Sequence, residues 1–212
     1  MIYLKAILLV FGAYLIGNIN FARILSKKVN SDITKQGSGN PGTMNMLRSY
    51  GAKLGGLTLL LDLLKGAVPS ILGFFIFGGY SNLALAYFGL YLAGISVIIG
   101  HIYPVFYKFK GGKGVASSLG VFLVANPIVT LIVFIVAVIY LWLFEYGSIS
   151  SFIMITALTI VEVLRLYSYN NIGIFICLFF ILFFTFFSHR KNIIRLFNGK
   201  ENKVSLKNIF KK

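Results

Sequence analysis

Long apolar runs constrain this chain more than any other feature of its sequence. About 20 apolar residues cross a bilayer as an α-helix, and six runs reach that scale, at 2–24, 56–79, 82–100, 127–144, 151–168 and 171–188. The mean hydropathy is +0.88, and only 12% of the 212 residues are charged. A soluble domain of this size needs far more surface charge. The sequence therefore predicts an all-α integral membrane protein with a single domain over residues 1–212.

A further apolar segment, 114–125, is too short to cross the membrane alone. As a helix it would reach only roughly 18 Å. We expect either a half-span packed among its neighbours or the inward leg of a hairpin that turns at Asn126–Pro127. If this segment is counted as a membrane span, all Lys and Arg residues except Lys5 and Arg165 lie toward the same side of the membrane. The positive-inside rule then favours seven transmembrane helices, with the N-terminus outside and the C-terminus in the cytoplasm.

The net charge is +15, and most of the basic residues that produce it lie between the apolar runs. In this setting it indicates topology and anionic partners, not nucleic acid. The first run is followed by Arg23, Lys27 and Lys28 and lacks a convincing cleavage site, so we expect a retained span and no removed signal. The tail 189–212 is basic, with Lys211 and Lys212 at its end. We expect it to lie on the cytoplasmic membrane surface.

Four polar segments fall at the predicted cytoplasmic boundary. They are GSGNPGTMNMLR (37–48), HIYPVFYKFKGGKG (101–114), EYGSISS (145–151) and HRKNIIRLFNGK (189–200). Irregular backbone at membrane depth is tolerated only where protein or a water-filled cavity satisfies its amides. Their convergence on one face therefore predicts a shared polar cavity.

The first segment has the composition of an anion site. Its glycines at 37, 39 and 42 permit positive φ, and successive N–H groups in such turns form an anion-binding nest. Pro41 is suited to open a helix, which would place Asn45 and Arg48 on one side at i and i+3. Arg48 would then grip two phosphate oxygens. The alternative is a solvated turn with an arginine at the lipid headgroups.

The second segment combines glycines with lysines. Lys108, Lys110 and Lys113 surround Gly111–Gly112, and Gly114 opens the short apolar segment. The Walker A spacing is absent. The alternative is that the glycines form a simple turn and the lysines only contribute to the positive-inside charge of the cytoplasmic loops. His101 is either an acid or base or a structural residue at the end of a span.

Two charged pairs lie within the spans at i and i+3. Asp62 and Lys65 are either functional or a mutual ion pair, whereas Glu162 and Arg165, near the outer end, favour a structural pair. Ser148, Ser150 and Ser151 either donate to an anion or cap the following helix. The single cysteine, Cys177, allows no intrachain disulfide, and no metal-ligand cluster is present in the sequence.

Together, the stretches GSGNPGTMNMLR, DLLKGAVP (62–69), GHIYPVFYKFKGGKGVASS (100–118) and HRKNIIRLFNGKE (189–201) resemble the bacterial acyl-phosphate:glycerol-3-phosphate acyltransferase family, of PlsY type. The resemblance covers nearly the whole chain. It implies an enzyme of the inner membrane that moves an acyl group from acyl phosphate to the 1-hydroxyl of glycerol 3-phosphate, giving lysophosphatidate and phosphate. It implies no cofactor, no metal and no coenzyme A. The implied partners are membrane lipids, the two substrates and the enzyme that makes acyl phosphate, with no nucleic acid.

The resemblance also implies site residues. Those carried over residue by residue are Ser38, Asn40, Asn45, Arg48, His101, Lys110, Lys113, Ser148, Ser150 and Asn192. We expect the backbone amides of Ser38–Gly42, among them Gly39, and those of Gly111, Gly112, Lys113 and Gly114 to hold the acyl phosphate together with Ser38, Asn40 and Ser148. Glycerol 3-phosphate would meet Asn45, Arg48, Lys110, Ser150 and Asn192. The catalytic candidates are Ser38, His101 and Asp62.

The proton acceptor stays open at this point. His101 is expected to be the only histidine near the cavity, Asp62 is an alternative, and the departing phosphate is a third. The chain departs from the family pattern at Thr43–Met44, where Ala-Thr is common, and at Gly17–Asn20, where a Gly-Ser-Ile-Pro turn is common. A transporter of phosphate or organophosphate would use similar features, but such folds tend to show internal repeats, and none is found here. A lipid-binding scaffold would explain the basic tail without explaining the glycine segments.

Overall fold

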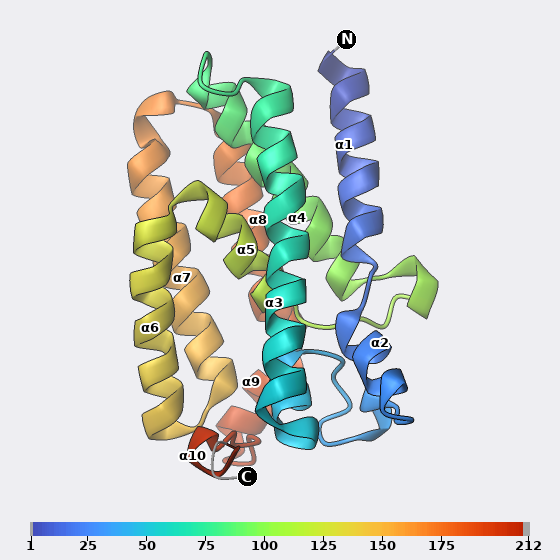
Figure 1. Ribbon diagram of the computed structural model, residues 1–212. Helices are drawn as coiled ribbons and strands as arrows, with labels where there is room; N and C mark the ends of the chain where they lie inside the picture. Colours follow the sequence, from blue (N-terminus) through green and yellow to red (C-terminus); the bar gives the residue numbers. More distant parts are fainter. Residues whose placement is uncertain (1, 210–212) are drawn as a thin grey trace.

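The computed structural model describes residues 2–209, and in that range the chain is helical with no strands. The α-helices are α1 Ile2–Gly17, α2 Phe21–Lys28, α3 Thr43–Phe77, α4 Leu83–Ile102, α5 Val115–Ala125, α6 Pro127–Phe144, α7 Gly147–Leu166, α8 Ile172–Ser188, α9 Arg190–Phe197 and α10 Leu206–Ile209. Short 3₁₀ turns lie at Ile33–Lys35, Val105–Tyr107 and Tyr167–Tyr169. The long helices run alongside one another as a bundle (Figure 1).

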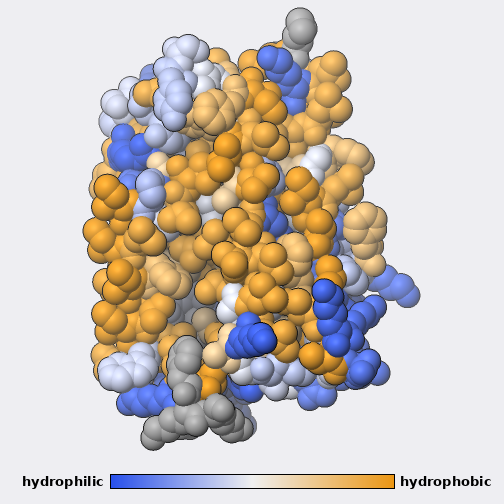
Figure 2. Space-filling model, viewed as in Figure 1, coloured by the Kyte–Doolittle hydropathy of each residue, from blue (hydrophilic) through white to orange (hydrophobic). Residues whose placement is uncertain are grey.

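Five helical stretches are long and apolar enough to cross a membrane. They are Ile2–Lys28, Thr43–Phe77, Leu83–Tyr107, Pro127–Phe144 and Gly147–Tyr169. The pair α8 and α9, bent by 54°, makes a sixth if it counts as one span. The expected all-α membrane fold is confirmed, and apolar side chains cover most of the face in Figure 2. Helices suit this setting because each backbone group is satisfied within its own segment.

The segment expected at 114–125 is the helix α5, with 11 residues. At 1.5 Å per residue it is about 16 Å long, roughly half the hydrocarbon thickness. It packs against α3 through glycine. A Cβ on Gly66 would lie 2.1 Å from the Ser117 carbonyl oxygen, and one on Gly120 would lie 2.0 Å from that of Leu63. Such small residues let two helix backbones approach closely, which holds this short helix inside the bundle.

A buried polar network fixes the turn between α5 and α6. Arg165 donates from Nε and Nη2 to the Glu162 carboxylate at 3.0 and 2.6 Å, and its Nη2 also reaches the Ala125 carbonyl. Glu162 further accepts from Tyr91 Oη at 2.6 Å and from Asn126 Nδ2 at 3.2 Å. The Glu162–Arg165 pair is therefore structural, as expected, because it ties α7 to α4 and to the α5–α6 turn.

The break between α1 and α2 is held by a buried lysine. Lys65 Nζ donates to the carbonyls of Gly17 at 3.3 Å and Ile19 at 2.7 Å, and pairs with Asp62 Oδ1 at 2.9 Å. The last carbonyls of a helix lack intrahelical partners, so this ammonium satisfies groups that the break exposes. The ion pair between Asp62 and Lys65 is confirmed.

Several irregular segments, at 29–42, 145–146 and 198–205, lie at the end of the bundle where α3 begins and where α2, α9 and α10 lie (Figure 1). The tail, which we expect on the cytoplasmic membrane surface, also packs against the bundle there. Val204 N–H donates to the Glu145 carbonyl at 2.8 Å, and the Val204 side chain is buried. Lys207 and Lys203 lie over the rings of Trp142 and Tyr146. The described part of the tail thus folds back against α6, because it supplies apolar and cationic groups that pack there. The expected positions of Lys211 and Lys212 lie outside the described residues.

Candidate functional site

A cavity of about 1030 Å³ opens among α3, α5, α6, α7 and α9 at the end of the bundle that carries the irregular segments. Its walls include Lys and Arg residues from several elements, namely Arg23, Arg48, Lys108, Lys110, Lys113, Lys191 and Arg195, against the acidic Asp62 and Glu201. The cavity therefore carries a surplus of positive charge, which suits anionic ligands.

The structure brings together nearly all of the residues expected at the site. The wall contains Ser38, Gly39, Asn40, Gly42, Asn45, Arg48, Asp62, His101, Lys110, Gly111, Lys113, Gly114, Ser148, Ser150 and Asn192. Gly112 is the exception: it does not line the cavity, and a Cβ at this position would clash with the His101 ring. Polar segments separated by long apolar helices thus meet in one place.

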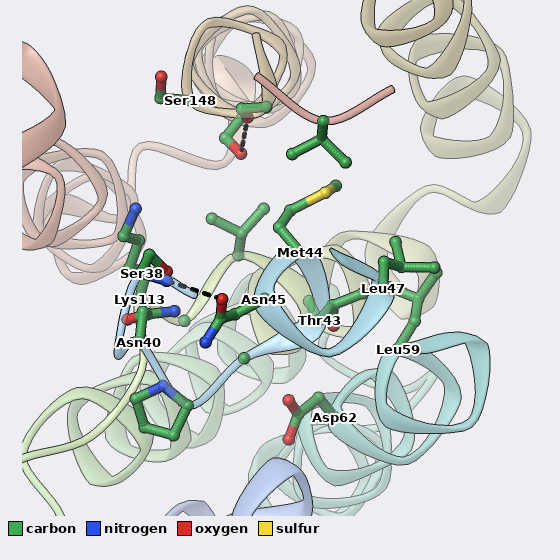
Figure 3. A pocket seen from close by; sticks show the side chains of 18 of the residues that line it. Ser38, Asn40, Thr43, Met44, Asn45, Leu47, Leu59, Asp62, Lys113 and Ser148 are labelled. Carbon is green, nitrogen blue, oxygen red and sulfur yellow. Dashed lines mark hydrogen bonds between the residues drawn. The ribbon is translucent and has the colours of Figure 1, made fainter. Parts of the chain in front are cut away.

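Asn45 holds the first glycine segment in shape. Its Oδ1 accepts from the Ser38 N–H at 3.0 Å, and its Nδ2 donates to the carbonyls of Gln36 at 2.9 Å and Ile33 at 3.3 Å. The Asn45 side chain is buried, and Figure 3 shows its bond to Ser38. This amide is occupied by the protein, so Asn45 positions the loop and is poorly placed to bind glycerol 3-phosphate directly.

The expected backbone nests need correction. The N–H groups of Ser38, Gly39 and Gly42 donate to Asn45 Oδ1, the Gln36 carbonyl and the Asn40 carbonyl. In the second segment, the N–H groups of Gly111 and Gly112 donate to the carbonyls of Ile102 and His101. The glycines permit tight turns whose amides are satisfied internally. These five amides are therefore not free to hold a phosphate.

Helix N-termini supply the backbone donors instead. Among residues 2–209, no side chain caps the N-termini of α3, α5 or α7. The residues at these three starts, Thr43, Val115 and Gly147, all line the cavity. The first N–H groups of a helix lack intrahelical partners, and the helix dipole adds positive potential. Three helix starts at one cavity therefore favour an anion.

A chain of hydrogen bonds links three of the polar segments. Lys113 Nζ donates to Asn192 Oδ1, and Asn192 Nδ2 donates to Glu201 at 2.6 Å. Glu201 also accepts from Arg195 Nε at 3.0 Å and from Ser148 Oγ at 3.3 Å. Burial lowers the pKa of the Lys113 ammonium to about 8, although the Glu201 carboxylate opposes that shift. Lys113 is therefore a cation that loses its charge in mildly alkaline solution.

His101 is surrounded by protein groups. Its Nδ1 lies 3.8 Å from Asp62 Oδ1, and its Nε2 lies 2.1 Å from where a Cβ on Gly112 would stand. The His101 side chain is buried, and the backbone carbonyl of His101 accepts a hydrogen bond from the Gly112 N–H. Nδ1 thus faces Asp62, and the closeness of the ring to Gly112 gives His101 a role in shaping the second glycine segment.

His189 also lines the cavity, so the expectation of a single histidine there was wrong. Its Nδ1 lies 2.7 Å from the Thr185 carbonyl oxygen. Because a carbonyl can only accept, Nδ1 carries the proton and Nε2 of the neutral ring is an acceptor. The spacing of His189 and Asn192, at i and i+3 at the start of a helix, is the signal that could have found it. Arg23, Arg195 and Glu201 were likewise missed.

Ser150 is less available than expected. Its Oγ donates to the Ala137 carbonyl at 2.7 Å, which ties α7 to α6. Ser151 Oγ donates back to the Gly147 carbonyl at 2.8 Å. Neither hydroxyl caps the helix by a side-chain bond. Of the three serines, Ser148 alone donates to a side chain of the cavity wall, the Glu201 carboxylate, and not to a backbone carbonyl.

The cavity has an apolar part beside the polar one. In Figure 3, Ser38, Asn40 and Lys113 lie on one side of the pocket, whereas Met44, Leu47 and Leu59 lie on the other. The apolar wall continues on α5, α6 and α7 with Leu119, Phe134, Ala137, Val138, Leu141 and Met154. This division suits a ligand with an anionic head and an apolar chain.

Known proteins match this chain over most of its length. A family model described as glycerol-3-phosphate acyltransferase matches residues 7–199. The glycerol-3-phosphate acyltransferase of Finegoldia magna is 39% identical over 203 residues, which is 95% of this chain and 98% of the relative. That of Syntrophotalea carbinolica is 40% identical over 197 residues, 92% of this chain and 96% of the relative.

Two crystal structures of PlsY, an integral membrane glycerol 3-phosphate acyltransferase, are also similar. The glycerol 3-phosphate form superposes with a TM-score of 0.81 at 33% identity, and the lysophosphatidic acid form with 0.79 at 32%. Each comparison covers 98% of this chain and 100% of the solved one. Together with the apolar helices of this chain, the similarity shows that the chain is a multi-pass membrane protein. The chain belongs to the glycerol-3-phosphate acyltransferase family, in its PlsY-type branch.

Proposed function

We propose that this protein transfers a fatty acyl group from acyl phosphate to the 1-hydroxyl of glycerol 3-phosphate, releasing lysophosphatidate and inorganic phosphate. The observation that carries the proposal is the divided cavity, in which three uncapped helix starts and several cations adjoin an apolar wall. Both substrates carry phosphate, and one of them also carries an apolar chain. One cavity of this kind suits both.

The acyl phosphate lies at the start of α5 in this account. The first amides of α5, Lys113 Nζ and the hydroxyls of Ser38 and Ser148 bind its phosphate, and Asn40 completes that wall. Charge-assisted hydrogen bonds to phosphate are roughly twice as strong as neutral ones. The acyl chain lies against the apolar wall between α3 and α6, and it enters sideways from the bilayer.

Glycerol 3-phosphate binds beside it. Arg48 is the main anchor, because its buried Nε has no hydrogen-bond partner among the described residues and its side chain lines the cavity. Lys110 and Asn192 complete the site, with Asn192 oriented by Glu201. Holding both substrates in one cavity turns a bimolecular reaction into an effectively unimolecular one.

The chemistry follows from the mixed anhydride. The 1-hydroxyl oxygen attacks the acyl carbon, and a new C–O bond forms as the bond to the phosphate oxygen breaks. Preorganised donors at the helix starts stabilise the tetrahedral oxyanion. The departing phosphate takes the hydroxyl proton. Asp62 is paired with Lys65, and a phosphate leaving group is itself basic enough to accept the proton.

The proposed topology has seven membrane helices, with α5 as the half-length member, the N-terminus outside and the cavity open to the cytoplasm. Most Lys and Arg residues lie on α2, the start of α3, the 103–114 loop and α9, around the cavity end of the bundle. The positive-inside rule places that end in the cytoplasm of the bacterial inner membrane.

The direct test is incubation of purified protein in detergent with acyl phosphate and glycerol 3-phosphate. We expect lysophosphatidate and phosphate in equal amounts, and no product when acyl-coenzyme A replaces acyl phosphate. A reaction without glycerol 3-phosphate corrects for spontaneous hydrolysis. Absence of lysophosphatidate would refute the proposal, and a transporter would show no turnover in detergent.

A further inference from the structure

The short helix α2 lies beside both glycine-rich segments (Figure 1). At its start, Asn20 Nδ2 donates to the Pro41 carbonyl at 3.3 Å, and Asn20 Oδ1 caps α2 by accepting from the Arg23 N–H at 3.0 Å. One turn on, Arg23 Nη2 donates to the Lys110 carbonyl at 2.9 Å. Two side chains three positions apart therefore join the first segment to the second.

Both side chains are held in place by their surroundings. Asn20 is buried, and the guanidinium of Arg23 lies over the Tyr107 ring, 4.7 Å from its centroid. The apolar side of α2 is also fixed, because Ala22 and Leu25 pack with Ile33 and Met46 in one buried cluster. Since Met46 belongs to α3, α2 is anchored to the helix that carries Asn45 and Arg48. The links at Pro41 and Lys110 thus start from a rigid element.

We infer that Asn20 and Arg23 form a brace that sets the separation of the two substrate-binding segments. This inference rests on the proposed function, in which Pro41 adjoins the acyl-phosphate site and Lys110 the glycerol 3-phosphate site. Arg23 is a positioning residue, because it acts through the backbone of Lys110. A misplacement of about 1 Å between reacting groups can cost on the order of 100-fold in rate, so a brace between the two binding segments controls turnover without touching the acyl carbon.

Two substitutions separate the halves of the brace. Asn20→Ser keeps a good helix cap but is too short to reach Pro41. Arg23→Gln removes the charge and the fork that meets Lys110. Lys27→Gln is the matched control, because it removes the same charge from an exposed position on the same helix.

The kinetic test uses initial rates for each variant and for the double variant. We expect Arg23→Gln to lower kcat/KM for glycerol 3-phosphate about tenfold, Asn20→Ser to lower it about fivefold, and Lys27→Gln to stay within about twofold of wild type. Because both links serve one brace, the double variant should be no worse than about twofold below Arg23→Gln alone. The brace would be refuted if the losses in kcat/KM of the two single variants multiplied in the double variant. It would also be refuted if Arg23→Gln had the same kcat/KM as Lys27→Gln.

A second readout does not depend on activity. Amide hydrogen exchange should rise over 103–114 in Arg23→Gln and over 37–44 in Asn20→Ser, while α7 stays as protected as in wild type. Unchanged exchange in both segments contradicts the brace even if the enzyme is active. Conversely, locally raised exchange in a protein with no acyl transfer would support the brace while refuting the proposed function.

Discussion

Lys113 Nζ donates to the side-chain oxygen of Asn192, which joins the loop before α5 to the start of α9 across the cavity. Asn192 is in turn oriented by Glu201. The ammonium is therefore held at the cavity wall by a residue from a distant segment of the chain. In its proposed role as a phosphate ligand, Lys113 depends on its charge, which burial makes sensitive to pH.

The pH dependence of the reaction should report this lysine. The pKa of Lys113 is lowered to about 8, so its charge is present below that pH and is lost as the pH rises through it. The second pKa of a phosphate group is about 6, so the substrates do not change charge in this range. We expect kcat/KM for acyl phosphate to fall above pH 8 in wild type, and Lys113→Arg to abolish that fall. An identical fall in both proteins would assign it to another group.

Arg48 should control the affinity for glycerol 3-phosphate. Arg48→Ala removes a charge-assisted contact worth roughly 1.5–3 kcal/mol, so KM for glycerol 3-phosphate should rise about 10- to 100-fold. We expect kcat at saturating substrate to change much less. Initial rates at saturating acyl phosphate give both constants. Lys53→Ala, on the same helix but exposed, is the control and should leave KM unchanged. A loss confined to kcat would remove Arg48 as the anchor.

Neither histidine should be essential as a base. General-base catalysis contributes about 10²- to 10⁴-fold. If the departing phosphate takes the proton, His101→Gln and His189→Gln should each keep more than about 1% of wild-type kcat. Single-turnover rates at saturating substrates measure this. If either variant lost about 1000-fold with its KM values unchanged, that histidine would be the base.

Glu162 should contribute to stability and not to chemistry. Removing one partner of a buried pair leaves the other uncompensated, at a cost of about 3 kcal/mol or more. Glu162→Gln should therefore lower the thermal midpoint in detergent clearly, and the surviving folded protein should keep wild-type KM values. Glu145→Gln, at the end of α6 and outside this network, should leave the midpoint nearly unchanged. Equal midpoints for the two variants would contradict the network.

Much of this fold could be predicted because hydropathy alone marks a membrane helix. The apolar runs at 127–144 and 171–188 match α6 and α8 closely, since lipid leaves the backbone no alternative. The start of α3 was harder. The apolar run begins at 56, whereas the helix expected after Pro41 begins at Thr43 and joins that run across a kink at Gly51, where φ is 79°. Polar residues in those first turns hide the helix from a hydropathy reading.

The membership of the site could also be predicted, but its internal bonding could not. Glycine and lysine spacing identified the segments that meet at the cavity. It did not show that Asn45 binds the first loop, or that the amides of Gly111 and Gly112 are already paired. Such bonds depend on the path of the backbone, which spacing leaves open. His189 was missed for a related reason, because only the bend between α8 and α9 turns it toward the cavity.

The central claim is that Arg48 and Lys113 share one cavity open to a single side of the membrane. Membrane-impermeant thiol labelling of Arg48→Cys and Lys113→Cys, each in a Cys177→Ala background and in vesicles of known orientation, tests this directly. We expect both cysteines to react from the cytoplasmic side and neither from the outside. Reaction of the two positions from opposite sides would mean that no common reaction centre exists.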